Sequence, residues 1–333
     1  MTGSMPELRY IDALRTALAD EMAADPRVCV LGEDVGLGGP FGATKGLVER
    51  FGDRRVRDTP ISEATVAGLA VGAAVAGLRP VVEVMFVDFI TLAMDQLVNH
   101  AAKLRYMTGG ALGVPLTVRA QFGASGGFGA HHSQSLEAWF AHVPGLRAVA
   151  PATPNDAYHM LRAAIRSDDP VLFFEHRALY WQRGEVGEPD GDAWAALIRR
   201  PGEDVTIVTW SRMTWSVLEA AARLAEEGIS AEVVDLRALA PAPLEPVVES
   251  VRRTRRLAVV HEAVTTAGLG AEIVARVTEG ALDALAAPPV RVGAPFVPPP
   301  AGPELEALYV PSPERIASEV RSLVARTRRE SRS

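Results

Sequence analysis

The sequence has little cysteine and no long apolar run. Cys29 is the only cysteine among 333 residues, so no disulfide can form within the chain and a cysteine-rich zinc site is excluded. In its surroundings, VCVLGED, we expect Cys29 to be a small buried hydrophobic residue. The longest run without Asp, Glu, Lys, Arg or His, from Ala64 to Leu78, has fifteen residues, whereas a membrane-spanning helix needs about 20 strongly apolar ones. We therefore expect no membrane segment.

An excess of positive charge is also absent. Lys and Arg number 34 against 41 Asp and Glu, which gives a net charge of −7. A chain of this charge is not expected to bind nucleic acid or an anionic membrane surface. The first residues lack the basic-then-apolar order of a secretory signal, so we expect a cytoplasmic protein. Hydrophobic residues make up 48% of the chain, which is enough for a sizeable core.

The chain instead shows a repeated alternation of valine-rich apolar runs with amphipathic stretches. Short apolar strands separated by helices are typical of a parallel sheet covered on both faces. In the first part we predict strands at 27–31, 80–86, 115–122, 147–149 and 170–175, and helices at 10–24, 64–76, 89–106 and 154–166. In the second part we predict strands at 205–209, 231–236, 256–261 and 290–292, and helices at 214–227, 270–277 and 313–326.

The alternation stops once, in a polar and turn-rich stretch that indicates a linker. We therefore predict an α/β protein with two doubly wound domains, at 1–182 and 204–328, joined by a linker at 183–203 and followed by a flexible tail at 329–333. The second domain is the smaller one. A proline-rich loop, GAPFVPPPAGPELEAL, precedes the last predicted helix.

The uncharged stretch 64–78 is a glycine-rich helix. Gly68, Gly72 and Gly77 each cost helix stability, by about 1 kcal/mol relative to alanine. Such a helix usually allows another backbone to approach closely, either inside one subunit or between two subunits. Glu63 stands at its start, where the helix dipole stabilises an acid and Ser62 is a candidate cap. In a close-packed setting the carboxyl would lose hydration, its pKa could rise, and it could then exchange a proton in catalysis.

Two glycine-rich runs do not fit nucleotide-phosphate motifs. GLGGPFG has Phe41 where the dinucleotide fingerprint needs glycine, and GASGGFG lacks the Lys-Ser/Thr of a P-loop. The second run leads into His131 and His132 at the end of a predicted strand, which is where doubly wound sheets bind ligands. These histidines are either surface residues or catalytic groups. The basic cluster RRTRR, at 252–256, is interpreted as a solvated helix end, with partner binding as the alternative.

Together these motifs resemble the β subunit of the thiamin-diphosphate-dependent decarboxylating component of 2-oxo acid dehydrogenase complexes. The matching stretches cover about residues 7 to 325 in family order; they are VLGEDVG, FGATKGL, RVRDTPISE, GAAVAGLRPVVEVMFVDF, DQLVNHAAKLRYMTGG, HHSQSLEAWFAHVPGL, DVTIVTW and HEAVTTAGLGAEI. The resemblance implies a pyrimidine-binding domain followed by a transketolase C-terminal domain. It also implies an α2β2 tetramer with each cofactor held between an α and a β chain.

The same resemblance implies roles for individual residues. Glu63 would hydrogen-bond N1′ of the cofactor pyrimidine and so support removal of the proton from the thiazolium carbon. Phe89 would stack on the pyrimidine ring. His132 would face the substrate and exchange protons with the intermediate and the incoming dihydrolipoyl group. His131 would line the substrate pocket. A structural K⁺ site would be formed at Leu116, Ala164, Ile165, Ser167 and Asp169.

One family motif is missing. Thiamin enzymes hold Mg²⁺ and the diphosphate through GDG followed by a later Asn, but here Gly-Asp is followed by Arg54 or Ala193. The chain therefore resembles half of an active site, and we expect an α partner to carry the diphosphate half and Mg²⁺. A lipoyl acyltransferase core would receive the acyl group, and the substrate would be a small 2-oxo acid or acetoin.

Three alternatives remain open at this stage. A free-standing α2β2 thiamin-dependent enzyme would transfer its acyl or ketol group to a non-lipoyl acceptor. A nicotinamide-dependent Rossmann dehydrogenase is disfavoured by Phe41. A non-catalytic scaffold subunit is disfavoured by the joint presence of Glu63, Phe89 and His132.

Overall fold

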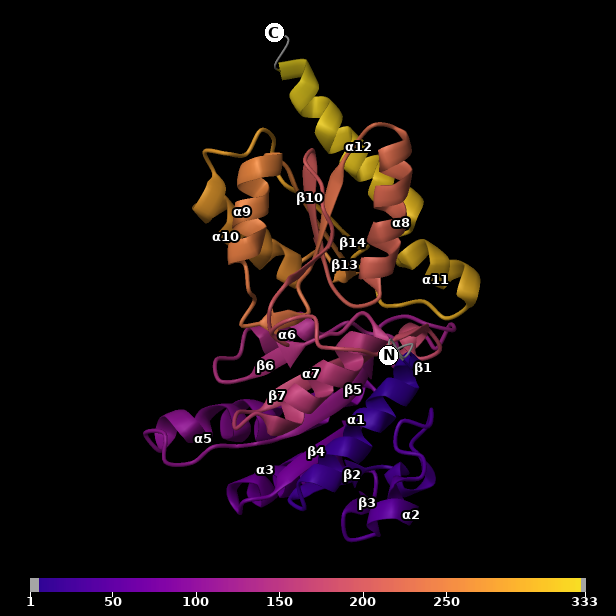
Figure 1. Cartoon of the computed structure of the whole chain (residues 1–333), viewed down its shortest axis with the longest axis vertical. Helices are drawn as coiled ribbons and strands as arrows, with labels where there is room; N and C mark the ends of the chain where they lie inside the picture. The colour runs from indigo at the N-terminus through magenta and orange to yellow at the C-terminus, as the bar shows by residue number, and fades with distance from the viewer. Residues whose placement is uncertain (1–5, 331–333) are drawn as a thin grey trace, which may run out of the picture. The chain divides into compact units, whose positions relative to one another are not determined.

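The computed structural model describes residues 6–330 and divides into two compact units. Unit 1 contains the chain up to Phe122 and the segment Trp139–Ala193. Unit 2 contains the segment Gly123–Ala138 and the chain from Trp194 onward. Figure 1 follows the elements of each unit along the chain.

Unit 1 is built on a parallel sheet. Its strands lie in the order β6-β7-β5-β4-β2-β3. Their bounds are β2 Val28–Gly32, β3 Val56–Asp58, β4 Arg79–Val84, β5 Thr117–Phe122, β6 Arg147–Val149 and β7 Val171–His176. The central strands β2, β5 and β7 are buried at every residue, as expected for a sheet covered on both faces.

Helices cover both faces of this sheet because the chain reverses direction across it. The connections β3–β4 and β4–β5 cross the sheet in one direction and β6–β7 returns in the other, so right-handed crossovers place their helices on opposite faces. The helical elements are α1 Tyr10–Ala24, η1 Val35–Leu37, α2 Leu47–Phe51, α3 Glu63–Val75, α4 Val87–Ile90, η2 Thr91–Ala93, η3 Asp95–Ala101, α5 Ala102–Met107, α6 Glu137–Ala141, α7 Pro154–Arg166 and η4 Arg177–Leu179. α1 packs on α7, and α3 packs on β4.

Unit 2 contains a second sheet in the order β14-β13-β10-β11-β9, parallel except for the edge strand β9. The strands are β9 Leu197–Arg200, β10 Val205–Thr209, β11 Ala231–Asp235, β12 Ala238–Ala240, β13 Leu257–Val264 and β14 Val290–Ala294, and the helices are α8 Met213–Glu226, α9 Glu245–Thr254, α10 Leu269–Ala281, α11 Pro303–Tyr309 and α12 Pro313–Glu330. The apolar faces of α8 and α12 enclose a core with β10, β11 and β13.

The predicted fold class is confirmed, and most predicted elements are found within a few residues of their observed bounds. The segment 183–203, predicted as a linker, contains two short strands, β8 (Arg183–Glu185) and β9, and β8 pairs with β1 (Glu7–Arg9). The proline-rich loop contains α11. The long helix predicted at 89–106 is interrupted, since η2 is a 3-10 turn and η3 a π-helix.

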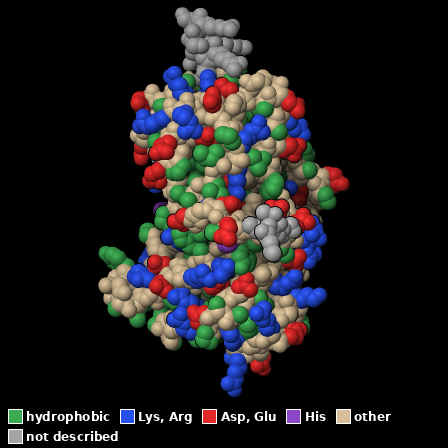
Figure 2. Space-filling view, in the orientation of Figure 1, with side chains coloured by type: hydrophobic (Ala, Val, Ile, Leu, Met, Phe, Trp, Pro, Cys, Tyr) green, Lys and Arg blue, Asp and Glu red, His purple; other side chains and the backbone are tan. Residues whose placement is uncertain are grey.

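Other predictions concern buried, charged and terminal residues. Cys29 is buried, as predicted. The RRTRR cluster does end a helix, α9, and Arg253 pairs there with Glu232 at 2.7 Å. Of the predicted tail 329–333, residues 331–333 lie outside the described residues, and α12 continues through residue 330. Among the helices in the described range, none is long and apolar enough to cross a membrane. On the face seen in Figure 2, acidic and basic side chains are interspersed.

A buried cation joins three neighbouring strands of unit 1. The Arg119 guanidinium on β5 donates to Glu83 Oε2 on β4 at 2.6 Å and to both carboxylate oxygens of Glu175 on β7, at 2.6 and 2.9 Å. Only 1% of the Arg119 side chain is exposed. Burial alone would lower the pKa of Arg119, but the charges of Glu175 and Glu83 outweigh burial and raise it.

Removing this cation is expected to destabilise the protein strongly. Arg119→Met would leave two buried carboxylates without a counter-ion, which should lower the free energy of unfolding by about 3–5 kcal/mol. Urea denaturation followed by circular dichroism measures the change. As a control, Arg27→Met breaks an exposed pair with Asp25 and should cost about 1 kcal/mol or less. Equal losses in the two variants would contradict this account.

Candidate functional site

The carboxyl edge of the unit 1 sheet contains a point where the strand order reverses. β2 and β4 are neighbours, and β2 leads to β3 on one side whereas β4 leads to β5 on the other, so the connections that follow β2 and β4 run in opposite directions. Doubly wound sheets bind ligands in the crevice outside the strand ends at such a point. Glu33 follows β2 directly, Glu63 follows β3, and Phe89 follows β4. Three separate segments therefore bring these residues to one edge.

Glu63 is the first residue of α3 and is half-buried. Its position at the positive end of the helix dipole favours a carboxylate there, as predicted. Ser62 occupies the cap position, but the expected cap is not formed, because its hydroxyl donates to the Thr65 hydroxyl at 2.7 Å rather than binding a backbone N–H. The start of α3 is therefore left without a side-chain cap beside the carboxyl group.

Glu33 is a site residue that sequence reasoning missed. Partial burial raises the pKa of its carboxyl, and the nearby charges of Glu63 and Asp34 raise it further. The charge of the Glu63 carboxyl therefore acts on the Glu33 carboxyl at the strand edge. The only sequence signal was the position of Glu33, immediately after a buried strand in VLGED.

Phe89 lies in the short helix α4 and is half-buried. Its ring meets the ring of Phe86 edge-on, with centroids 6.1 Å apart and an interplanar angle of 87°. The edge-on contact fixes the ring while leaving ring faces for other contacts. The crevice edge thus carries carboxyl groups and an oriented aromatic ring, a combination that fits a flat, hydrogen-bonding heterocycle.

The segment Gly123–Ala138, which contains His131 and His132, is held by unit 2. The amides of Gly126 and Gly127, both in the left-handed region, donate to the two carboxylate oxygens of Glu306 at 3.0 and 2.8 Å. The Ala124 amide donates to Glu262, and Arg212 donates to the Ala124 carbonyl. The glycine run therefore binds a carboxylate of its own chain, which agrees with the absence of a phosphate motif. His131 is exposed and His132 is half-buried.

A buried acid follows these histidines. Glu137 Oε1 accepts a hydrogen bond from the Trp210 indole N–H at 3.2 Å, and the Trp210 ring stacks on His261 with centroids 5.4 Å apart. Burial raises the pKa of Glu137 to about 7, and the Glu262 charge adds to the increase. Burial also lowers the pKa of His261 to about 4. Glu137 therefore keeps its proton to a higher pH than an exposed glutamate does.

Comparison with known proteins identifies this architecture. The model for "Transketolase, pyrimidine binding domain" matches residues 6–182, and that for "Transketolase, C-terminal domain" matches 195–316. The β subunit of acetoin:2,6-dichlorophenolindophenol oxidoreductase from Cupriavidus necator is 46% identical over 325 residues, covering 93% of this chain and 95% of the relative. The β subunit of 2-oxoisovalerate dehydrogenase from Bacillus subtilis is 41% identical, covering 96% of this chain and 99% of the relative.

The chain belongs to the family of β subunits of thiamin-diphosphate-dependent 2-oxo acid and acetoin dehydrogenases. A solved structure described as a split-gene transketolase in an inactive β4 tetramer aligns with a TM-score of 0.77 at 24% identity, covering 97% of this chain and 99% of that one. At that identity the likeness concerns the fold alone.

The five carbonyls assigned to K⁺ by family resemblance surround the α7–β7 connection. Each already accepts one hydrogen bond: Leu116 from Val171 N at 2.9 Å, Ala164 from Ser167 N at 3.1 Å, Ile165 and Ser167 from Arg79 Nη1 at 3.1 and 2.9 Å, and Asp169 from Ser167 Oγ at 2.9 Å. A carbonyl has two lone pairs, so each retains one for a cation. Two of the five, those of Ile165 and Ser167, accept from the positively charged Arg79 guanidinium, and K⁺ binding stays a prediction for this β subunit.

The Glu306 contact should control the order of the histidine segment. Glu306→Gln would replace one accepting oxygen with an NH₂ group, which cannot accept from a glycine amide. We expect faster hydrogen exchange at Gly126 and Gly127, corresponding to a loss of about 1.5–3 kcal/mol for the charged hydrogen bonds. Glu304→Gln, on the same helix but exposed, is the control. Unchanged exchange in the Glu306 variant would show that the contact does not hold the segment.

The raised pKa of Glu137 predicts a pH-dependent stability. Because the folded state binds this proton more tightly than the unfolded state, the stabilisation is complete below about pH 4.5 and is lost as pH rises through about 7. Glu137→Gln should therefore be more stable than the wild type at pH 8, by an amount on the order of 2–3 kcal/mol, and should match it near pH 4. Urea midpoints across pH measure this, with exposed Glu272→Gln as control. A constant difference at all pH values would refute the assignment.

Proposed function

We propose that this β subunit supplies the pyrimidine half of the active site in an α2β2 enzyme that cleaves a small 2-oxo acid or acetoin. The observation that carries the proposal is the convergence of Glu63, Glu33 and Phe89 on the strand-order reversal of the unit 1 sheet. The chemistry that thiamin diphosphate supplies when bound is a nucleophilic carbon and an electron sink for the cleaved carbon–carbon bond.

Glu63 is proposed to hold and return the proton at the pyrimidine N1′ position. A carboxyl is suited to this task when it is partly removed from water and fixed on a rigid element. Glu63 is half-buried at the first residue of α3, a helix packed on β4. The nearby Glu33, whose pKa is raised, adds a second group that holds a proton more readily than an exposed acid does.

Phe89 and the histidines are assigned supporting roles. Phe89 would contact the flat heterocycle with a ring face, since its edge contact with Phe86 fixes its orientation. His132 would exchange protons with the substrate and the acyl acceptor, because an imidazole titrates near neutral pH. His131 is proposed to affect the polarity of the substrate pocket. The segment that carries both histidines is anchored through Glu306 and Glu262, which gives these histidines a defined backbone.

An α subunit is proposed to provide the Mg²⁺ and diphosphate half, because the GDG motif is missing from this sequence. The relatives are themselves named β subunits, which supports a partner of this kind. A lipoyl domain is the proposed acyl acceptor. The exposed Leu69 and Val75 of α3, beside Gly68 and Gly72, support a helix–helix contact between subunits. K⁺ at the α7–β7 connection is proposed as a structural ion.

The role of Glu63 is tested by Glu63→Gln in the chain co-expressed with its α partner. We expect the thiamin-diphosphate-dependent cleavage rate, measured with an artificial electron acceptor on pyruvate, branched 2-oxo acids and acetoin, to fall by at least about 10²-fold. Assembly with the α chain, measured by size-exclusion chromatography, should not change. Glu49→Gln, an exposed acid of α2, is the matched control. Full activity of the Glu63 variant would overturn the proposal.

A further inference from the structure

A pocket within unit 1 is lined by residues that the proposed function does not use. Its volume is about 680 Å³, and it is lined by Arg9, Ile11, Arg15, Pro40, Phe41, Gly42, Lys45 and Trp181. These residues come from the end of β1, the first half of α1, the loop between η1 and α2, and the residues that follow η4. The volume falls within the range of about 300–1,000 Å³ that is typical of small-molecule sites.

Three cations and no acid line this pocket. Arg9 and Arg15 both donate to the Asp12 carboxylate behind them, Arg9 through Nε at 2.5 Å and Nη2 at 3.0 Å. Arg15 Nη1 also donates to the Gly42 carbonyl at 3.2 Å. These bonds fix both guanidinium groups before any ligand arrives. Lys45 is exposed and has no ion-pair partner within the described part of the chain.

The charges therefore do not balance within the site. Asp12 offsets one of the three cations, which leaves an excess of two positive charges. The hydrogen bond from Arg9 is the main cause that lowers the pKa of Asp12, so Asp12 stays ionised and continues to hold the two arginines. An excess of two charges matches a phosphate group, which carries about −1.5 to −2 at neutral pH. Arginine forks and a lysine together are typical phosphate ligands.

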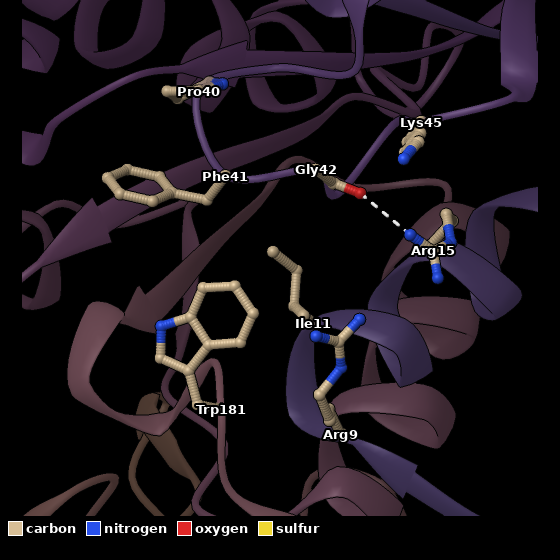
Figure 3. Close-up of a pocket in the computed structure, with 8 residues that line it drawn as sticks. All are labelled: Arg9, Ile11, Arg15, Pro40, Phe41, Gly42, Lys45 and Trp181. Atoms are coloured by element: carbon tan, nitrogen blue, oxygen red, sulfur yellow. Dashed lines mark hydrogen bonds between the residues drawn. The ribbon is translucent and has the colours of Figure 1, made fainter.

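The other side of the pocket is aromatic. The Trp181 side chain is 60% exposed, and the Arg9 guanidinium lies 5.1 Å from its ring centroid. The Phe41 ring meets the Tyr180 ring edge-on, with ring centroids 5.7 Å apart, and this contact holds the Phe41 ring in place. Figure 3 shows Phe41 and Trp181 on one side of the pocket and the three cations on the other, with Ile11 between them. An exposed tryptophan beside an arginine is suited to stack a flat ring.

We propose that this pocket binds a small ligand with a flat heteroaromatic ring and a phosphate group, of the nucleoside phosphate class. The ring would stack on Trp181 and Phe41, and the phosphate would accept hydrogen bonds from Lys45, Arg15 and Arg9. A purely apolar ligand would leave the excess positive charge of the pocket unbalanced. The proposal does not depend on the catalytic role of Glu63, because binding is measured directly.

Two lysines in the whole chain, Lys45 and Lys103, allow a selective test. The full chain, assembled with its α partner, is treated with an amine-acetylating reagent with and without adenosine 5′-monophosphate, and labelling at each lysine is read by peptide mass spectrometry. We expect saturating nucleotide to slow labelling of Lys45 about tenfold and to leave Lys103 unchanged. Titration calorimetry should show at least tenfold weaker binding of adenosine and of inorganic phosphate.

Variants separate the two halves of the site. Lys45→Ala should weaken nucleotide binding about tenfold, as expected for one lost charge-assisted hydrogen bond, and Trp181→Leu should weaken it while leaving the affinity for inorganic phosphate unchanged. Lys103→Ala is the matched control and should bind as the wild type does. The proposal is overturned if no saturable binding occurs, if Lys45→Ala binds normally, or if the α partner alone protects Lys45, which would make the pocket a subunit contact.

Discussion

The Arg119 guanidinium is buried between three adjacent strands of unit 1. The position of the site residues depends on the hydrogen bonds that pair this cation with carboxylates on the neighbouring strands. Arg119 joins β4, β5 and β7 through Glu83 and Glu175, and the Tyr180 hydroxyl donates to the same Glu175 carboxylate at 2.8 Å. A buried ion pair contributes little net stability, but it is costly to break. These hydrogen bonds thus hold the three strands in one register. They do so close to the carboxyl edge of the sheet, where Phe89 follows β4.

The two sheets use their strand-order reversals differently. In unit 2 the reversal lies between β10 and β13, and it is occupied by the chain's own segment 123–138, through Glu137 on Trp210 and the Ala124 amide on Glu262. In unit 1 the corresponding edge presents carboxyl groups and an aromatic ring. The same fold rule therefore gives a crevice suited to a ligand in unit 1 and a crevice filled by the segment 123–138 in unit 2. The contacts in the filled crevice fix the segment that carries the histidines.

Local signals account for what could be predicted from the sequence. The helix α7 was predicted at its observed bounds from its helical pattern, and the structure shows Thr153 and Asp156 forming a capping box at its start. The interruption of the helix predicted at 89–106 could not be foreseen, because the sequence has no glycine or proline where the 3-10 turn and the π-helix occur. Glu306 was also missed, because it lies 180 residues from Gly126, and a carboxylate in a proline-rich stretch carries no local mark of its partner.

The acids Glu33 and Glu63, at the carboxyl edge of the unit 1 sheet, carry an electrostatic cost for the fold. Two carboxyls brought together in partly buried surroundings repel each other when both are ionised, and the cost is relieved when one keeps a proton. Partial burial raises the pKa of Glu33, and the charges of Glu63 and Asp34 raise it further. A core selected for stability alone would replace one acid with an apolar or neutral residue. Two acids at a strand-order reversal, beside an oriented phenylalanine, are the arrangement that the proposed proton exchange with a bound heterocycle would use.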